Sequence, residues 1–179
     1  MPFPPMHCSV AYLARWLRLG LSLPALLVGV MAPDLENPII YVVTSGQYGR
    51  LVLHSLLGAV TLAPLLSAVL VVFAYPPVVS FLFRIDRAAV KARCRFSWGV
   101  VGVCLAGNLS HVLIDALHHE YNPLFFPFTY SSVDALVLFN DSFLSSVVVQ
   151  TALLVLLILF VAKEARMDRK DIWKRLLVE

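Results

Sequence analysis

The chain has 179 residues, of which 60% are hydrophobic and only 14% are charged, and its formal net charge is +3. This composition is too apolar for a soluble domain, and the small basic surplus gives no indication of a nucleic-acid partner. The three cysteines, Cys8, Cys94 and Cys104, have no C-x-x-C spacing, which argues against a disulfide framework and a cysteine zinc site. We therefore expect one all-α membrane domain over residues 1–179, because three or four crossings of about 20 residues consume most of the chain.

Residues 12–19 and 21–31 are two short apolar pieces separated by Gly20. One interpretation is a cleaved signal peptide, although Pro33 directly after the cleavage site disfavours it. A second is a single crossing over residues 10–31, the fourth span, which would leave His7 and Asp34 on opposite faces.

The interpretation that we prefer for this region is a helical hairpin. One helix runs over about residues 7–19, the chain turns at Gly20, and Ser22 caps a second helix with Pro24 in its first turn. His7 and Asp34 then meet at the same end, and the hairpin requires Arg15 and Arg18 to reach the membrane surface or to face protein.

Three longer apolar segments predict membrane-spanning helices, and none of the three spans contains lysine or arginine. The first lies in the run 51–83 and crosses over about residues 51–74, with a kink or break at its prolines. The second covers residues 97–117 and the third covers residues 142–162.

Basic residues gather in two segments, RIDRAAVKARCR at 84–95 and KEARMDRKDIWKR at 163–175. The positive-inside rule makes both cytoplasmic and places residues 34–50 and 118–141 outside. We expect a multi-pass protein of the bacterial inner (plasma) membrane with a cytoplasmic C-terminus. The tail, residues 163–179, has apolar residues at helical spacing among charges, which suits an amphipathic helix on the inner membrane surface or a solvated helical end.

All the histidines fall at or near the predicted outer ends of the helices; they are His7, His54, His111, His118 and His119. In SHVLIDALHH, the spacing of His111, Asp115 and His118 places the three side chains on one helical stripe. Imidazole and carboxylate are zinc ligands, and a buried aspartate in a membrane helix is costly unless it pairs with a cation or a metal. His119 is turned about 80° from His111 and is a weaker candidate. As simpler alternatives, Asp34 caps a helix and His54 anchors its span at the headgroups.

Four segments in order, MPFPPMH, LPALLVGVMAPDLE, HSLLG and SHVLIDALHHEYNPLFFPF, resemble the YdjM-like group of bacterial membrane proteins, which are described as metal-dependent hydrolases. The resemblance covers roughly residues 1–128. That group is distantly similar to the zinc-dependent phospholipase C and single-strand nuclease superfamily, which is all-helical. The resemblance implies one or two zinc ions, with a ligand set made of His7, Asp34, His54, His111, Asp115 and one further histidine, His118 or His119.

These features predict a zinc hydrolase that acts on a phosphoester or ester of a lipid or amphiphile at the outer membrane face. Asp34 or Asp115 would bridge ions or orient water, and Arg50 and His119 would contact the substrate, Arg50 by attracting a phosphate. Two other classes stay open. One is a non-enzymatic protein whose structural metal or His/Asp network supports helix packing or assembly. The other is a proton or metal-ion transporter, which would need polar groups throughout the bilayer depth.

Overall fold

The computed structural model describes residues 4–167 and 171–179, so the first three residues of MPFPPMH and residues 168–170 of the predicted tail lie outside the described part. Throughout the described residues the chain is helical or irregular and forms no strand, which confirms the predicted all-α class. The elements in chain order are η1 (Pro4–His7), α1 (Cys8–Trp16), α2 (Leu23–Met31), η2 (Pro33–Leu35), α3 (Glu36–Val43), α4 (Leu56–Val60), α5 (Leu62–Val69), η3 (Leu70–Ala74), α6 (Tyr75–Phe83), α7 (Arg87–Arg93), α8 (Trp98–Ala116), η4 (Asp134–Leu136), η5 (Leu138–Asn140), α9 (Ser142–Met167) and α10 (Ile172–Leu177).

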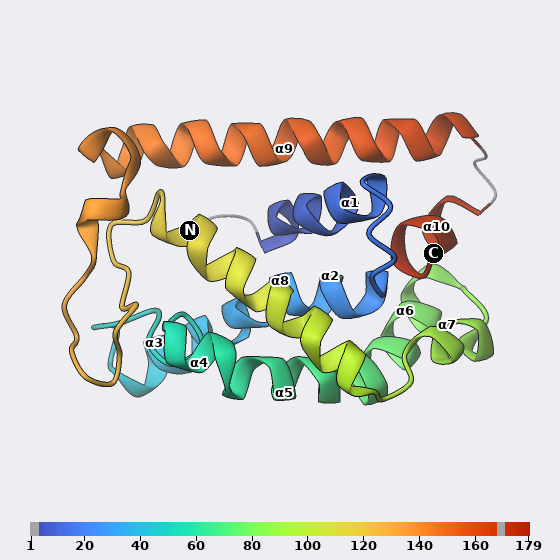
Figure 1. Cartoon of the computed structure of the whole chain (residues 1–179), viewed down its shortest axis with the longest axis horizontal. Coiled ribbons are helices and arrows are strands. Elements are labelled where there is room, and N and C mark those ends of the chain that lie inside the picture. Colours follow the sequence, from blue (N-terminus) through green and yellow to red (C-terminus); the bar gives the residue numbers. More distant parts are fainter. Residues whose placement is uncertain (1–3, 168–170) are drawn as a thin grey trace.

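The N-terminal region forms the predicted hairpin and not one continuous helix. α1 and α2 are separated by a turn in which Arg18 and Gly20 have φ angles of 54° and 67°, and glycine adopts this left-handed region at little cost. The two helices bury their facing side chains in a common core that includes Ala11, Tyr12 and Leu26. Figure 1 shows α1 and α2 side by side between α9 and α5.

Arg15 faces protein, as the predicted hairpin requires. Its guanidinium donates to the carbonyl of Arg175 at 2.6 Å and lies 3.2 Å from a carboxylate oxygen of Glu164. The charge therefore faces protein and an acidic partner, which removes the objection to an arginine in this helix.

Three helical segments are long and apolar enough to cross a membrane: Leu62–Phe83, Trp98–Ala116 and Ser142–Met167. The hairpin's second helix and the segment after it, Leu23–Met31 and Pro33–Val43, form a bent pair at 42° that can count as a fourth, broken span. The second predicted span is therefore confirmed almost to the residue, and the third is five residues longer than predicted.

The predicted bounds of the first span, residues 51–74, were wrong. Residues 51–55 are irregular, α4 is short, and the span-length segment begins at Leu62 and continues through Pro76 to Phe83. The apolar composition hid the irregular start, because a loop buried inside the protein can be as apolar as a helix. Pro76 is tolerated because it lies in the first turn of α6, and the wider π-helical turn before it, η3, accommodates the change.

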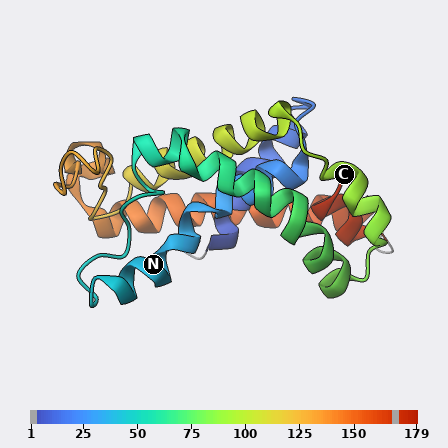
Figure 2. The same ribbon diagram turned by 90° about the horizontal axis from the view of Figure 1, so that it is seen from below.

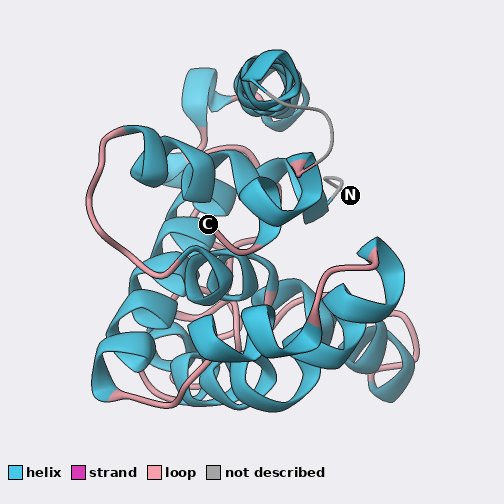
Figure 3. Cartoon of the chain, turned by 90° about the vertical axis from the view of Figure 1, so that its right-hand side faces the viewer, coloured by secondary structure: helices cyan, strands magenta, loops and turns pink. Residues whose placement is uncertain are grey.

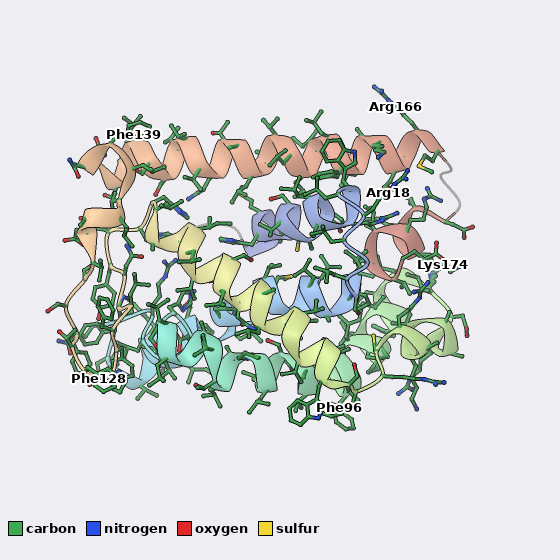
Figure 4. All side chains as sticks on the ribbon, viewed as in Figure 1. Arg18, Phe96, Phe128, Phe139, Arg166 and Lys174 are labelled. Atoms are coloured by element: carbon green, nitrogen blue, oxygen red, sulfur yellow. The ribbon has the colours of Figure 1, made fainter. Side chains whose placement is uncertain are left out.

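The spans give the molecule two ends that differ in charge. α9 runs along the full length of the molecule and α8 crosses diagonally beneath it (Figure 1). Arg18, Arg166 and Lys174 lie toward one end, whereas Phe128 and Phe139 lie toward the other (Figure 4). α7 and α10 share the end of the basic residues, and the loop between α8 and α9 forms the opposite end (Figure 2). α9 stands at the edge of the bundle (Figure 3), and most of its residues are exposed, as a lipid-facing helix requires.

α10 packs against the protein itself. Leu176 is buried, and the hydroxyls of Tyr12 and Tyr75 donate to the carbonyls of Leu176 and Leu177 at 3.0 and 2.6 Å. The apolar face that the sequence assigned to the membrane surface is therefore covered in part by α1 and α6.

α2 and α8 cross at two glycines. A Cβ atom added to Gly29 would lie 2.8 Å from the carbonyl oxygen of Cys104, and one added to Gly107 would lie 2.9 Å from the carbonyl carbon of Gly29. Only glycine permits this separation, as at other close crossings of membrane helices. The crossing brings the backbone at Val30 against His111, which is where the candidate site begins.

Candidate metal centre

Six side chains from five separate parts of the chain converge beside this crossing. His7 ends η1, Asp34 lies in η2, His54 lies in the irregular stretch before α4, His111 and Asp115 occupy the last turns of α8, and His118 follows that helix. All six side chains are at most 7% exposed. The structure therefore brings together every residue that the sequence proposed as a metal ligand.

Four of these residues present ligating atoms to one another: Asp34, His54, His111 and Asp115. The Nε2 atoms of His54 and His111 are 3.3 Å apart. Each is also 3.6 Å from Oδ1 of Asp34, and they are 3.7 and 3.4 Å from Oδ2 of Asp115. Ligand atoms around a tetrahedral zinc ion, each about 2.0–2.2 Å from the metal, lie about 3.3–3.6 Å apart. The spacing therefore fits a four-coordinate metal ion.

The tautomers of the two histidines leave both Nε2 atoms free to bind a metal. Nδ1 of His111 donates to the carbonyl of Val30 at 2.7 Å, and Nδ1 of His54 donates to Glu36 at 2.8 Å. In neutral rings the facing Nε2 atoms are then both acceptors, which cannot hydrogen bond to each other. A cation between them removes this conflict.

Glu36 is the residue of the site that the sequence reasoning missed. Its carboxylate accepts backbone N–H groups of Leu51, Leu53 and His54 at 3.0, 2.8 and 3.2 Å, in addition to the His54 ring. A carboxylate behind a histidine fixes the ring and makes it a better metal ligand. The available signal was its position two residues after Asp34 in PDLEN.

The other oxygen of Asp115 faces a second group of histidines. Oδ1 lies 3.3 Å from Nε2 of His7, 3.7 Å from Nε2 of His119 and 4.0 Å from Nε2 of His118. His118 donates its Nδ1–H to the carbonyl of Ile114, so its Nε2 is also free. Asp115 thus has one oxygen toward each group, which is the arrangement of a bridging carboxylate.

Arg50 and His119 form a pair at the edge of this second group. Arg50 lies 3.0 Å from Oδ2 of Asp115 and donates to Nε2 of His119 at 2.9 Å. Burial, together with the neighbouring guanidinium, lowers the pKa of His119 to about 3, so this ring is neutral and can accept from Arg50. His119 thus accepts a hydrogen bond from Arg50, and its ring also lies with Asp115 and His118 in a second group that could hold a metal ion.

The electrostatics of the cluster favour a bound cation. Among the described residues, the cluster contains three carboxylates, Asp34, Glu36 and Asp115, and one guanidinium, Arg50, which pairs with Asp115. With neutral imidazoles, two negative charges are then uncompensated. Burial alone lowers the pKa of His54, but the adjacent carboxylates outweigh it and raise that pKa above its ordinary value. Uncompensated charge away from water is costly, and a divalent ion would neutralise it.

The unsatisfied polar atoms point to the same place. Among the described residues, seven of the twelve buried side-chain atoms without a hydrogen-bond partner belong to His7, Asp34, Arg50, Asp115 and His118. Some of these atoms form the ion pairs between His7, Arg50 and Asp115 described above, and the concentration of such atoms at one place is consistent with a cation-binding site.

The fold and the cluster define a polytopic, all-α membrane protein with a buried His/Asp group able to hold a metal ion. Residues 7–171 match the family described as YdjM inner membrane protein, and the chain belongs to that family. The family description names the inner membrane, and three helical segments among the described residues are long and apolar enough to cross a membrane. The comparison with curated proteins and the comparison with solved structures find no match, so they contain nothing that links the chain to zinc-dependent phospholipase C.

Proposed function

We propose that this protein is a membrane-embedded, zinc-dependent hydrolase that cleaves a phosphoester or ester of a lipid or amphiphile. The observation that carries the proposal is the convergence of Asp34, His54, His111 and Asp115 at the spacing of metal ligands, with further free ligand atoms around Asp115. The mixed imidazole and carboxylate donors favour zinc over magnesium or calcium, which prefer oxygen ligands alone.

The chain's own residues supply the remaining parts of such a reaction. A zinc ion supplies a Lewis acid and brings the pKa of a water molecule close to 7. Asp34 keeps an oxygen, Oδ2, without a hydrogen-bond partner, and this oxygen can orient a water molecule and take its proton. Arg50 offers a guanidinium to a phosphoryl oxygen beside the same centre.

The first test measures the metal. Full-length protein purified in mild detergent is expected to contain about one or two zinc ions, and the double variant His111→Ala/Asp115→Ala is expected to contain none, because it removes two of the four converging ligands. Ser110→Ala, on the same helix, is the matched control and keeps its zinc. Unchanged zinc content in the double variant would contradict the proposal.

A structural metal site is the second candidate function, and one observation favours it. The first group already offers four protein ligands, all of them buried, which is the usual coordination of a structural zinc site. A panel of phosphodiester and carboxylic ester lipids separates the two. Turnover by the wild type that the double variant lacks supports the hydrolase, whereas bound zinc without turnover of either class supports the structural role.

A further inference from the structure

An apolar groove begins at the metal centre and is not used by the proposed chemistry. It has a volume of about 520 Å³ and lies between α1, α2, η3, α6 and α10. This volume is within the range of about 300–1,000 Å³ typical of small-molecule sites. Asp34 belongs to its lining, so one end of the groove is continuous with the proposed ligand set.

The lining of the groove fits hydrocarbon. Beyond Asp34 it is formed almost entirely by aliphatic and aromatic side chains, among them Leu27, Val28, Val79 and Phe83. Its rim includes Met31 and Val78, which are 36% and 51% exposed and give access from the side of the bundle. Because this side belongs to the apolar, membrane-length part of α6, the surrounding medium is lipid.

The groove is long enough for one lipid chain. Its lining on η3 and α6 extends from Leu70 to Phe83, a rise of about 20 Å along the helix. One leaflet contributes about half of the hydrocarbon thickness of about 30 Å, so the groove is at least as long as one leaflet is thick. Leu177 of α10 lies at the end shared with Phe83, whose ring packs against Trp173 at 4.8 Å, so the end remote from Asp34 is covered.

We propose that this groove holds one acyl chain of a phospholipid and so directs the ester or phosphoester group of that lipid to the metal centre at Asp34. The proposal rests on the proposed hydrolase function for the identity of the group at the centre. The apolar lining excludes the headgroup from the groove, and Asp34, the only carboxylate among the described residues that line it, is a candidate metal ligand. The substrate class is therefore a long-chain phospholipid and not a water-soluble ester.

The experiment compares groove-filling variants with a matched exterior variant. Val78→Trp and Met31→Trp place an indole in the groove from two different helices, so failure of one to fold leaves the other. Val155→Trp is the control, because Val155 is 48% exposed on α9 and does not line the groove. Native mass spectrometry of each full-length protein with added phosphatidylethanolamine measures the retained lipid, and elemental analysis measures the zinc.

The wild type and Val155→Trp are expected to retain one phospholipid. The groove variants are expected to retain it about tenfold less, the loss that excluding a few methylene groups gives, with unchanged zinc. Cleavage of a long-chain phospholipid should fall in parallel, while cleavage of a dibutyroyl analogue should not. Equal lipid retention and equal cleavage by all four proteins would overturn the proposal that the groove binds the acyl chain. If the groove variants lose the lipid but no protein cleaves either substrate, the result would support lipid binding in the groove and refute the hydrolase function.

Discussion

At the scale of single residues, Glu36 explains why His54 can act as a ligand although it lies outside regular secondary structure. The carboxylate binds three backbone N–H groups of residues 51–54 and the His54 ring at once. One side chain thus folds the irregular stretch and sets the tautomer. A buried carboxylate can hold a loop in this way because each charged hydrogen bond is stronger than a neutral one.

Glu36→Gln keeps the size of this side chain and removes its charge. Without the carboxylate the His54 ring is a weaker ligand, so zinc affinity should fall by about 10–100-fold while the protein still folds. Competition with a zinc chelator measures the affinity. Glu120→Gln is the control, because Glu120 is an exposed acid in the loop after α8, and this variant should bind zinc as the wild type does. Equal affinities in the two variants would remove the assigned role of Glu36.

At the scale of the elements, the site depends on how closely α2 approaches α8. Gly29 and Gly107 let the backbones touch, and the hydrogen bond from His111 to Val30 crosses the same contact. His111 comes from α8 and Asp34 follows directly after α2, so a change in the separation of these helices moves the two ligands relative to each other.

Gly107→Ala tests this dependence. The added methyl would meet the Gly29 backbone, so the helices must separate, and we expect a lower melting temperature in detergent together with a loss of zinc. Gly102→Ala is a matched control on the same helix, because a Cβ there meets nothing within 4 Å. That substitution should leave both values unchanged or raise the stability by up to about 1 kcal/mol, the helix propensity difference. If the two variants have the same melting temperature and zinc content, the site does not depend on the close approach of α2 and α8.

At the scale of the whole molecule, the separation of charge sets the expected orientation in the membrane. Arg18, Arg166 and Lys174 mark one end and the loop between α8 and α9 marks the other (Figure 4). Basic segments stay in the cytoplasm, so the second end should face outward, and the His/Asp cluster lies at the ends of elements that point toward it.

Cysteine labelling in intact cells tests this orientation. The natural cysteines are buried, so background labelling by a membrane-impermeant maleimide should be low. Phe128→Cys, in the loop after α8, should react from outside, whereas Arg87→Cys in α7 should react only after the membrane is permeabilised. The reverse pattern would invert the proposed topology. Arg87 and Phe128 are both exposed, so a difference in labelling reports the side of the membrane and not burial of the cysteine.

The sequence by itself determined the helical class and the second and third spans, favoured the hairpin over its alternatives, and placed His111, Asp115 and His118 on one helical stripe. These follow from local patterns: apolar length, helical periodicity, a glycine at a turn, and polar residues near the end of an apolar segment. The wider ligand set, with His7, Asp34 and His54, was implied by the family resemblance. Such patterns depend on neighbours along the chain, and a single sequence displays them.

Only the tertiary structure decided where the first span begins, what Glu36 binds, how Asp115 is shared between two groups, and that a groove opens at Asp34. Each of these depends on contacts between residues far apart in the chain, and those contacts are set by the crossing of α2 and α8 at Gly29 and Gly107. Hydrophobic periodicity indicates which face of a helix is apolar, but not which backbone it touches or at what distance. The convergence of the His/Asp cluster is a consequence of that distance.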